Sequence, residues 1–197
     1  MIKAFCMIFF STFFDIAGQI CSKKIYLWYN NNIVGDKIYR RMGSIMFFAK
    51  PGEYKACGLF TPEHFALIVA TFLCVGIALK KTVHKSKEEV YKIIKNLTII
   101  LWALEIFKIL YTLQDVKITN VKEWMPLYYC SLLLYAGFLS SFTRGHFRRA
   151  GDVFLATGSI VGGLVFILFP TTSLPTYPAF HFISILSFFF HGTMVYL

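Results

Sequence analysis

Charged residues are scarce in this chain of 197 residues and make up 15% of it, whereas a soluble domain carries roughly 25%. Hydrophobic residues make up 57%, including 22 Phe and 11 Tyr. So few charges cannot cover so much apolar surface in water, which excludes an ordinary soluble domain. We therefore expect a protein embedded in a lipid bilayer.

Acidic residues are scarcer still: 10 Asp and Glu stand against 20 Lys and Arg, which gives a net charge of +10. No basic stretch is interleaved with exposed aromatic residues, so we expect no nucleic-acid partner. Basic loops instead orient a protein that crosses the bilayer several times. The sequence predicts a multi-pass protein of the cell membrane whose partners are membrane lipids.

The cysteines lack the spacing of a disulfide framework or a structural zinc site. Their number, five, is odd, and no Cys-x-x-Cys pair occurs. We expect neither a bound metal nor a cofactor. The five are Cys6, Cys21, Cys57, Cys74 and Cys130.

Alternation of apolar and polar residues with period two is also absent, which excludes a membrane β-barrel and leaves helices. Residues 1–22 are predicted to form a first span, because no small-x-small cleavage pattern identifies a signal peptide there. Residues 23–62 are polar and basic and are predicted to form a long loop. Residues 63–197 are predicted to form a five-helix core. The expected fold is an all-α polytopic transmembrane helical bundle of about six spans.

The five core spans are each close to the roughly 17–25 residues that a transmembrane helix needs. The loops between the last three are short, so these helices should be antiparallel neighbours. The last stretch ends without a polar flank, as expected for a piece of a longer protein. The predicted spans are His64–Leu79, Leu97–Leu113, Met125–Phe142, Val153–Phe169 and Tyr177–Leu197.

Basic residues are distributed unevenly among the predicted loops. The loops after the first and third core spans together hold nine Lys and Arg, the intervening loop holds Lys117 and Lys122, and the loop before the last span holds none. We therefore expect the two basic loops to face the cytoplasm.

One cysteine and two histidines are candidates for catalysis. Cys130 follows the start of its predicted span by about one turn, and a thiol nucleophile needs a nearby base. At about 1.5 Å per residue, Cys130 would lie roughly 8 Å from the outer surface, His181 roughly 6 Å and His191 roughly 21 Å. Depth therefore groups Cys130 with His181 and with His64, which begins the first core span. The plainer alternative is that each is a core side chain without chemistry.

Polar residues inside the remaining spans predict a cavity or, alternatively, local pairing. Glu105 and Lys108 are three residues apart and share a helix face, so they either neutralise each other or line a cavity with His191 or His64. Tyr128 is a candidate for the same cavity or for the interfacial aromatic belt. Another pattern, Gly158-x-x-x-Gly162, predicts close packing against a partner helix.

Three short motifs give the chain a resemblance to a known family. The motifs are FTPEHF at Phe60–Phe65, MPLYYCS at Met125–Ser131 and FHG at Phe190–Gly192. From about residue 59 to the end, roughly 70% of the chain, the sequence resembles the YwaF-type family of bacterial integral membrane proteins, related to transmembrane protein 164. The family usually has His or Asn where Tyr128 stands here.

The resemblance implies a fold and, more loosely, an activity. Eukaryotic relatives resemble acyltransferases that act on phospholipids, with a cysteine that takes the acyl group and a histidine that assists. Carried over, these roles fall on Cys130 and most plausibly on His191. The depth of the residues favours His181 instead, so both histidines remain candidates.

Two functions from different classes follow. The first is a lipid acyltransferase with Cys130 as nucleophile, and the alternative is a non-enzymatic transporter or lipid-binding protein that uses Glu105, Lys108 and His191 as a polar track. A thiol within hydrogen-bond reach of a histidine nitrogen would favour the enzyme. A continuous polar path through the bundle would favour transport. A purely structural or assembly role is the third reading.

Overall fold

The computed structural model describes residues 47–49, 52–113 and 128–197, and this part of the chain is helical without a β-strand. The expected all-α class is therefore confirmed for it. The predicted first span at 1–22 and most of the predicted loop at 23–62 lie outside the described residues. The elements are α3 (Pro62–Thr82), α4 (Lys87–Leu113), η1 (Tyr129–Ser131), α6 (Leu132–Phe142), α7 (Gly145–Ala156), α8 (Gly158–Leu168) and α9 (Phe182–Tyr196).

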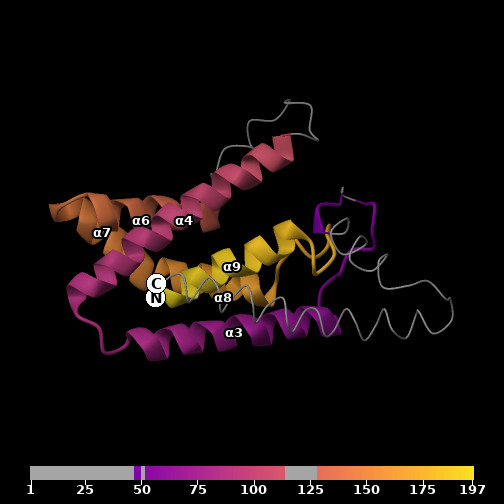
Figure 1. Cartoon of the computed structure of the whole chain (residues 1–197), viewed down its shortest axis with the longest axis horizontal. Coiled ribbons are helices and arrows are strands. Elements are labelled where there is room, and N and C mark those ends of the chain that lie inside the picture. The colour runs from indigo at the N-terminus through magenta and orange to yellow at the C-terminus, as the bar shows by residue number, and fades with distance from the viewer. Residues whose placement is uncertain (1–46, 50–51, 114–127) are drawn as a thin grey trace, which may run out of the picture.

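Helix α9 lies at the centre of the bundle. It packs along α8 and α3 and also contacts α4 (Figure 1). Phe188, Phe189 and Met194 of α9 are completely buried, as are Leu133 and Leu134 of α6 on the other side of the core. Burial of this many large apolar side chains stabilises the central position of α9.

Two helical segments are long and apolar enough to cross a membrane, Pro62–Thr82 and the nearly continuous pair Gly145–Leu168. On α3, the large side chains of Phe65, Val69 and Phe72 share one face and are exposed. An apolar stripe of this kind suits contact with lipid tails rather than water. The count of about six spans stays a prediction.

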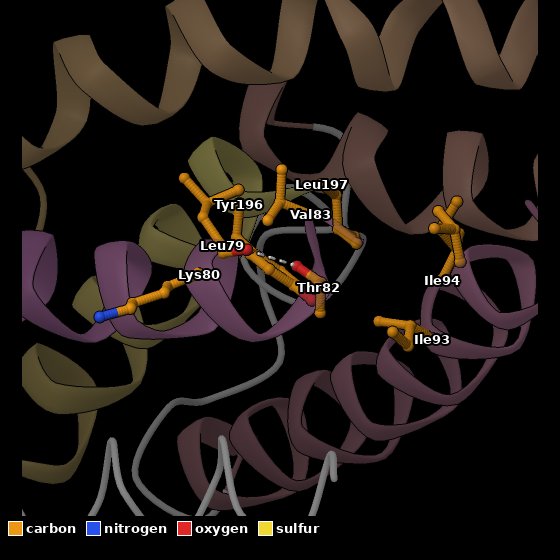
Figure 2. Close-up of a pocket in the computed structure, with 9 residues that line it drawn as sticks. Leu79, Lys80, Thr82, Val83, Ile93, Ile94, Tyr196 and Leu197 are labelled. Atoms are coloured by element: carbon orange, nitrogen blue, oxygen red, sulfur yellow. Dashed lines mark hydrogen bonds between the residues drawn. The ribbon is translucent and has the colours of Figure 1, made fainter. Parts of the chain in front are cut away.

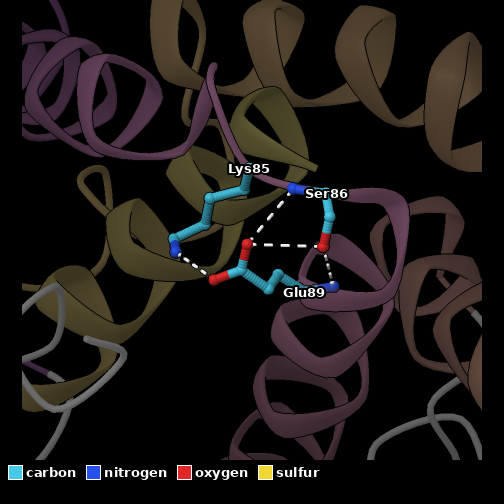
Figure 3. A network of polar contacts seen from close by, with 3 residues as sticks. All are labelled: Lys85, Ser86 and Glu89. Carbon is cyan, nitrogen blue, oxygen red and sulfur yellow. Dashed lines mark hydrogen bonds and ion pairs between the residues drawn. The ribbon is translucent and has the colours of Figure 1, made fainter.

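Helix α4 begins ten residues before the predicted span at Leu97, because its charged first turn is capped (Figure 3). Ser86 Oγ accepts the Glu89 backbone N–H at 3.3 Å, and Glu89 Oε2 accepts the Ser86 backbone N–H at 3.2 Å. This reciprocal arrangement is a capping box. Glu89 also accepts a hydrogen bond from Lys85 Nζ at 2.6 Å, and this bond, followed by the one from Ser86, holds the pKa of Glu89 below its ordinary value.

The loop after the predicted span Met125–Phe142 was expected to hold Arg144, Arg148 and Arg149. This loop is shorter than expected, because Arg148 and Arg149 belong to α7. Polar contacts at the junction with α4 and α6 explain why the helix extends this far. Asp152 of α7 accepts hydrogen bonds from Ser140 Oγ at 2.5 Å and from the Tyr91 hydroxyl at 2.9 Å. The Arg148 guanidinium lies 3.8 Å from the centre of the Tyr91 ring, which is a cation–π contact.

Small residues bring α8 and α9 close together. Ser159 Oγ lies 2.9 Å from the Met194 carbonyl oxygen. A Cβ atom placed on Gly163 would lie 2.8 Å from the His191 carbonyl oxygen and 2.7 Å from a methyl carbon of Val195. Because backbone atoms cannot move aside as a flexible side chain can, the two helices keep this spacing only with glycine at 163.

We expect Gly163→Ala to destabilise the protein by about 1–3 kcal/mol, because the added methyl group overpacks the contact between α8 and α9. The control is Gly76→Ala on α3, where an added Cβ meets nothing within 4 Å and alanine should favour the helix. Thermal unfolding of both variants in detergent is the measurement. Equal melting temperatures for the two variants would contradict the close packing of α8 on α9.

Candidate functional site

Both ring nitrogens of His64 are engaged in backbone hydrogen bonds. Nδ1 accepts the Phe60 N–H at 3.1 Å, so Nε2 carries the proton and donates it to the Ile167 carbonyl oxygen at 3.1 Å. Phe60 adopts a φ of 57°, a left-handed conformation that is uncommon for a bulky residue. His64 therefore ties the start of α3 to the end of α8, and it is not brought to the thiol.

Both ring nitrogens of His181 also form hydrogen bonds with backbone groups. It lies just before α9 as its N-cap, where Nδ1 accepts the Ile183 N–H at 3.1 Å. Its Nε2 donates to the Ala49 carbonyl oxygen at 2.9 Å, and the Tyr177 ring stacks on the imidazole at 4.2 Å. With no free nitrogen, His181 cannot take a proton from Cys130 unless it gives up its cap. This geometry conflicts with the choice of His181 from depth.

His191 keeps one free nitrogen. Its Nδ1 donates to the Ser187 carbonyl oxygen at 2.7 Å, one turn earlier in α9, which leaves the lone pair on Nε2. No described residue forms a hydrogen bond with Nε2. The ring is 4% exposed and stacks on Phe166 of α8 with centroids 3.5 Å apart. Among the three buried histidines of the described chain, His191 alone has a ring nitrogen without a hydrogen-bond partner.

The turn η1, which carries Cys130, lies against the first half of α8 because Tyr129 is held there. The Tyr129 hydroxyl donates to the Gly158 carbonyl oxygen at 2.9 Å. The Tyr129 ring covers Gly162, where any Cβ would collide with the ring carbons. The two glycines that predicted a helix-packing motif therefore receive an aromatic ring from the turn that carries Cys130.

His191 faces the same stretch of α8, through Gly163 and Phe166. Residues 158–166 of α8 extend over only about 12 Å. Counting residues from the starts of the predicted spans places Cys130 and His191 about 13 Å apart in depth, and that difference stays a prediction.

An ion pair with a buried carboxylate lies near both residues. Lys108 Nζ lies 2.6 and 2.7 Å from the two carboxylate oxygens of Glu105, which is 4% exposed. Lys108 is within electrostatic reach of Cys130 and of His191, and Glu105 is within reach of Cys130. We call Cys130, His191, Glu105 and Lys108 the polar cluster.

The thiol itself has a different set of neighbours from those expected. Cys130 is half-buried and lies against the hydroxyl and backbone N–H of Ser131. No hydrogen bond joins its sulfur to a histidine within the described residues. Tyr128 is 59% exposed and lies away from the cluster. Tyr129 and Ser131 were missed by sequence reasoning, although their adjacency to Cys130 was a usable signal.

The comparisons with known proteins identify the family. The family model of the TMEM164 family matches residues 59–197, and the chain therefore belongs to that family. Every member of the polar cluster lies within this range. The chain matches no curated protein and no solved structure. The resemblance predicted from three short motifs is confirmed, and with the apolar helices it identifies an integral membrane protein.

We expect His181→Ala to lower the free energy of unfolding by about 0.5–2 kcal/mol, the usual cost of losing an N-cap, because α9 loses its cap and Ala49 loses a hydrogen-bond donor. His146→Ala is the control, since His146 is an exposed residue of α7. Thermal unfolding of both variants tests the assignment. A His181 variant as stable as the His146 variant would contradict a structural role for His181.

Proposed function

We propose that this integral membrane protein transfers acyl groups between lipids, with Cys130 as nucleophile and His191 as the base. The carrying observation is that Tyr129 holds the turn that carries Cys130 against α8, while His191, the one buried histidine of the described chain with an unpartnered nitrogen, stacks on Phe166 of the same helix. Lys108 lies within electrostatic reach of both Cys130 and His191. Grouping of a nucleophile, a base and a charged pair is typical of catalytic sites.

In the first half-reaction, His191 Nε2 takes the proton of the Cys130 thiol and the sulfur attacks the ester carbonyl carbon of a phospholipid. The carbon–oxygen bond of the ester breaks, and the departing lysolipid oxygen receives that proton back from His191. The product is a thioester on Cys130. Since no hydrogen bond joins the two side chains in the substrate-free structure, a bridging water or a small movement on lipid binding must complete the path.

In the second half-reaction, the hydroxyl of an acceptor lysolipid attacks the thioester while His191 removes its proton. The carbon–sulfur bond breaks, and the sulfur regains a proton from His191. The chain thus returns to its starting state without an oxidant, a metal or a cofactor. A general base of this kind contributes about 10²–10⁴-fold to rate.

The other cluster residues have supporting roles. Burial and the Glu105 carboxylate disfavour a thiolate at Cys130, and Lys108 is the cation within electrostatic reach that opposes them. Glu105 holds Lys108 in place with both carboxylate oxygens. Tyr129 fixes the turn that carries Cys130 through its bond to Gly158. These contacts position the thiol rather than react with the lipid.

The same ion pair supports a second candidate, a non-enzymatic transporter or lipid-binding protein. Charged residues inside a bilayer are costly and commonly mark a path for polar substrates or headgroups. Glu105 is almost completely buried and Lys108 is only partly exposed. This candidate needs the charges of the cluster and does not need the thiol.

We expect the purified protein, incubated with phospholipid, to carry an acyl adduct on Cys130 that mass spectrometry detects. Cys130→Ser should lose both the adduct and acyl exchange, because a hydroxyl is a far weaker nucleophile than a thiolate. Cys74→Ser is the control, since Cys74 is buried in α3 away from the cluster. Exchange that survives Cys130→Ser would eliminate the enzyme and favour the transport candidate.

We expect His191→Ala to slow acyl exchange by about 10²–10⁴-fold, the typical contribution of a general base. His64→Ala should affect stability more than rate, because both nitrogens of His64 are engaged in backbone hydrogen bonds. Initial rates of exchange, measured with folded protein, separate the two. A His191 variant with the rate of the wild type would show that another group removes the proton.

A further inference from the structure

A pocket lies at the end of the bundle that holds the turn between α3 and α4. Its volume is about 460 Å³, within the roughly 300–1,000 Å³ of small-molecule sites. The end of α3, the beginning of α4 and the end of α9 form its walls (Figure 2). None of the residues of the polar cluster lines it.

The interior of this pocket is apolar. Leu79, Val83 and Ile93 are among the side chains that line it. Its two hydroxyl groups, on Thr82 and Tyr196, form a hydrogen bond with each other (Figure 2), and Thr82 Oγ1 also donates to the Ala78 carbonyl oxygen. Because these polar groups already have partners, the pocket suits a hydrocarbon chain better than a polar ligand.

The mouth of the pocket carries excess positive charge. Residues 80–95 contain six Lys and only two Glu. Glu89 is taken up by Lys85 at 2.6 Å, whereas Lys80 and Lys81 are exposed and form no ion pair within the described chain. The stem of Lys80 lines the pocket and its ammonium group points away from the apolar residues (Figure 2).

We propose that this pocket binds one acyl chain of an anionic phospholipid, with the headgroup phosphate held by Lys80 and Lys81. In a bilayer an acyl chain gains little by leaving other lipid tails, so the charge of the headgroup must provide the preference. Lysines near an anionic lipid surface supply that attraction. The site is separate from the acyl-transfer centre and does not depend on it.

We expect the full chain in detergent to retain phosphatidylglycerol more tightly than phosphatidylcholine in native mass spectrometry. Lys80→Gln combined with Lys81→Gln should weaken retention of phosphatidylglycerol by about tenfold or more, given the attraction per basic residue. Lys92→Gln combined with Arg149→Gln is the control, because it removes two exposed charges from the same end without touching the pocket.

A third variant tests the pocket itself. Val83 is 70% exposed at its rim, so Val83→Trp should fill the cavity without disturbing the core and should also weaken retention of phosphatidylglycerol. Equal retention of the two lipids, or equal losses in both double variants, would overturn the proposal. An inert Val83→Trp would overturn it too. If the wild-type chain prefers phosphatidylglycerol but shows no acyl exchange, only the proposed function is refuted.

Discussion

The pairing of buried imidazole nitrogens is the constraint on which the rest of this structure depends. A polar group that is buried in an apolar bundle costs free energy unless it forms a hydrogen bond. His64 and His181 meet this requirement twice each, through one backbone group close in sequence and one from a distant segment. His191 meets it once, at Nδ1. Because Nε2 of His191 has no hydrogen-bond partner among the described residues, His191 is the candidate base, whereas His64 and His181 are structural.

Sequence reasoning predicted the helices but not which histidine keeps a nitrogen without a hydrogen-bond partner. Apolar runs located α3 and α8 to within a few residues, and the motif at Phe190–Gly192 indicated His191. Counting residues from an assumed membrane surface grouped Cys130 with His181, but such a count contains no information on hydrogen bonds, and both ring nitrogens of His181 are engaged in them. The role of His181 was equally inaccessible, since its partner at Ala49 is 132 residues away in sequence.

The Glu105–Lys108 pair was recognised from sequence, but its meaning depends on position. On an exposed helix face, two residues of opposite charge three apart contribute little. Here Glu105 is nearly completely buried, and the two charges lie where η1, α9 and α4 approach each other. Moving a buried charge away from its partner is costly, and because both residues belong to α4, this helix neutralises Glu105 inside the bundle without a partner from another helix.

Helix α8 sets the register between the thiol and the imidazole. Its small residues form two adjacent contacts: Gly158 and Gly162 receive the Tyr129 ring, while Ser159 and Gly163 receive the backbone of α9. Residues 158 and 162 share one helix face, and residues 159 and 163 share the next. The small residues of the first half of α8 therefore contact both the segment that carries Cys130 and the helix that carries His191. Since α8 is the common wall, a change of side-chain volume on either face alters the distance between the two groups without touching either one.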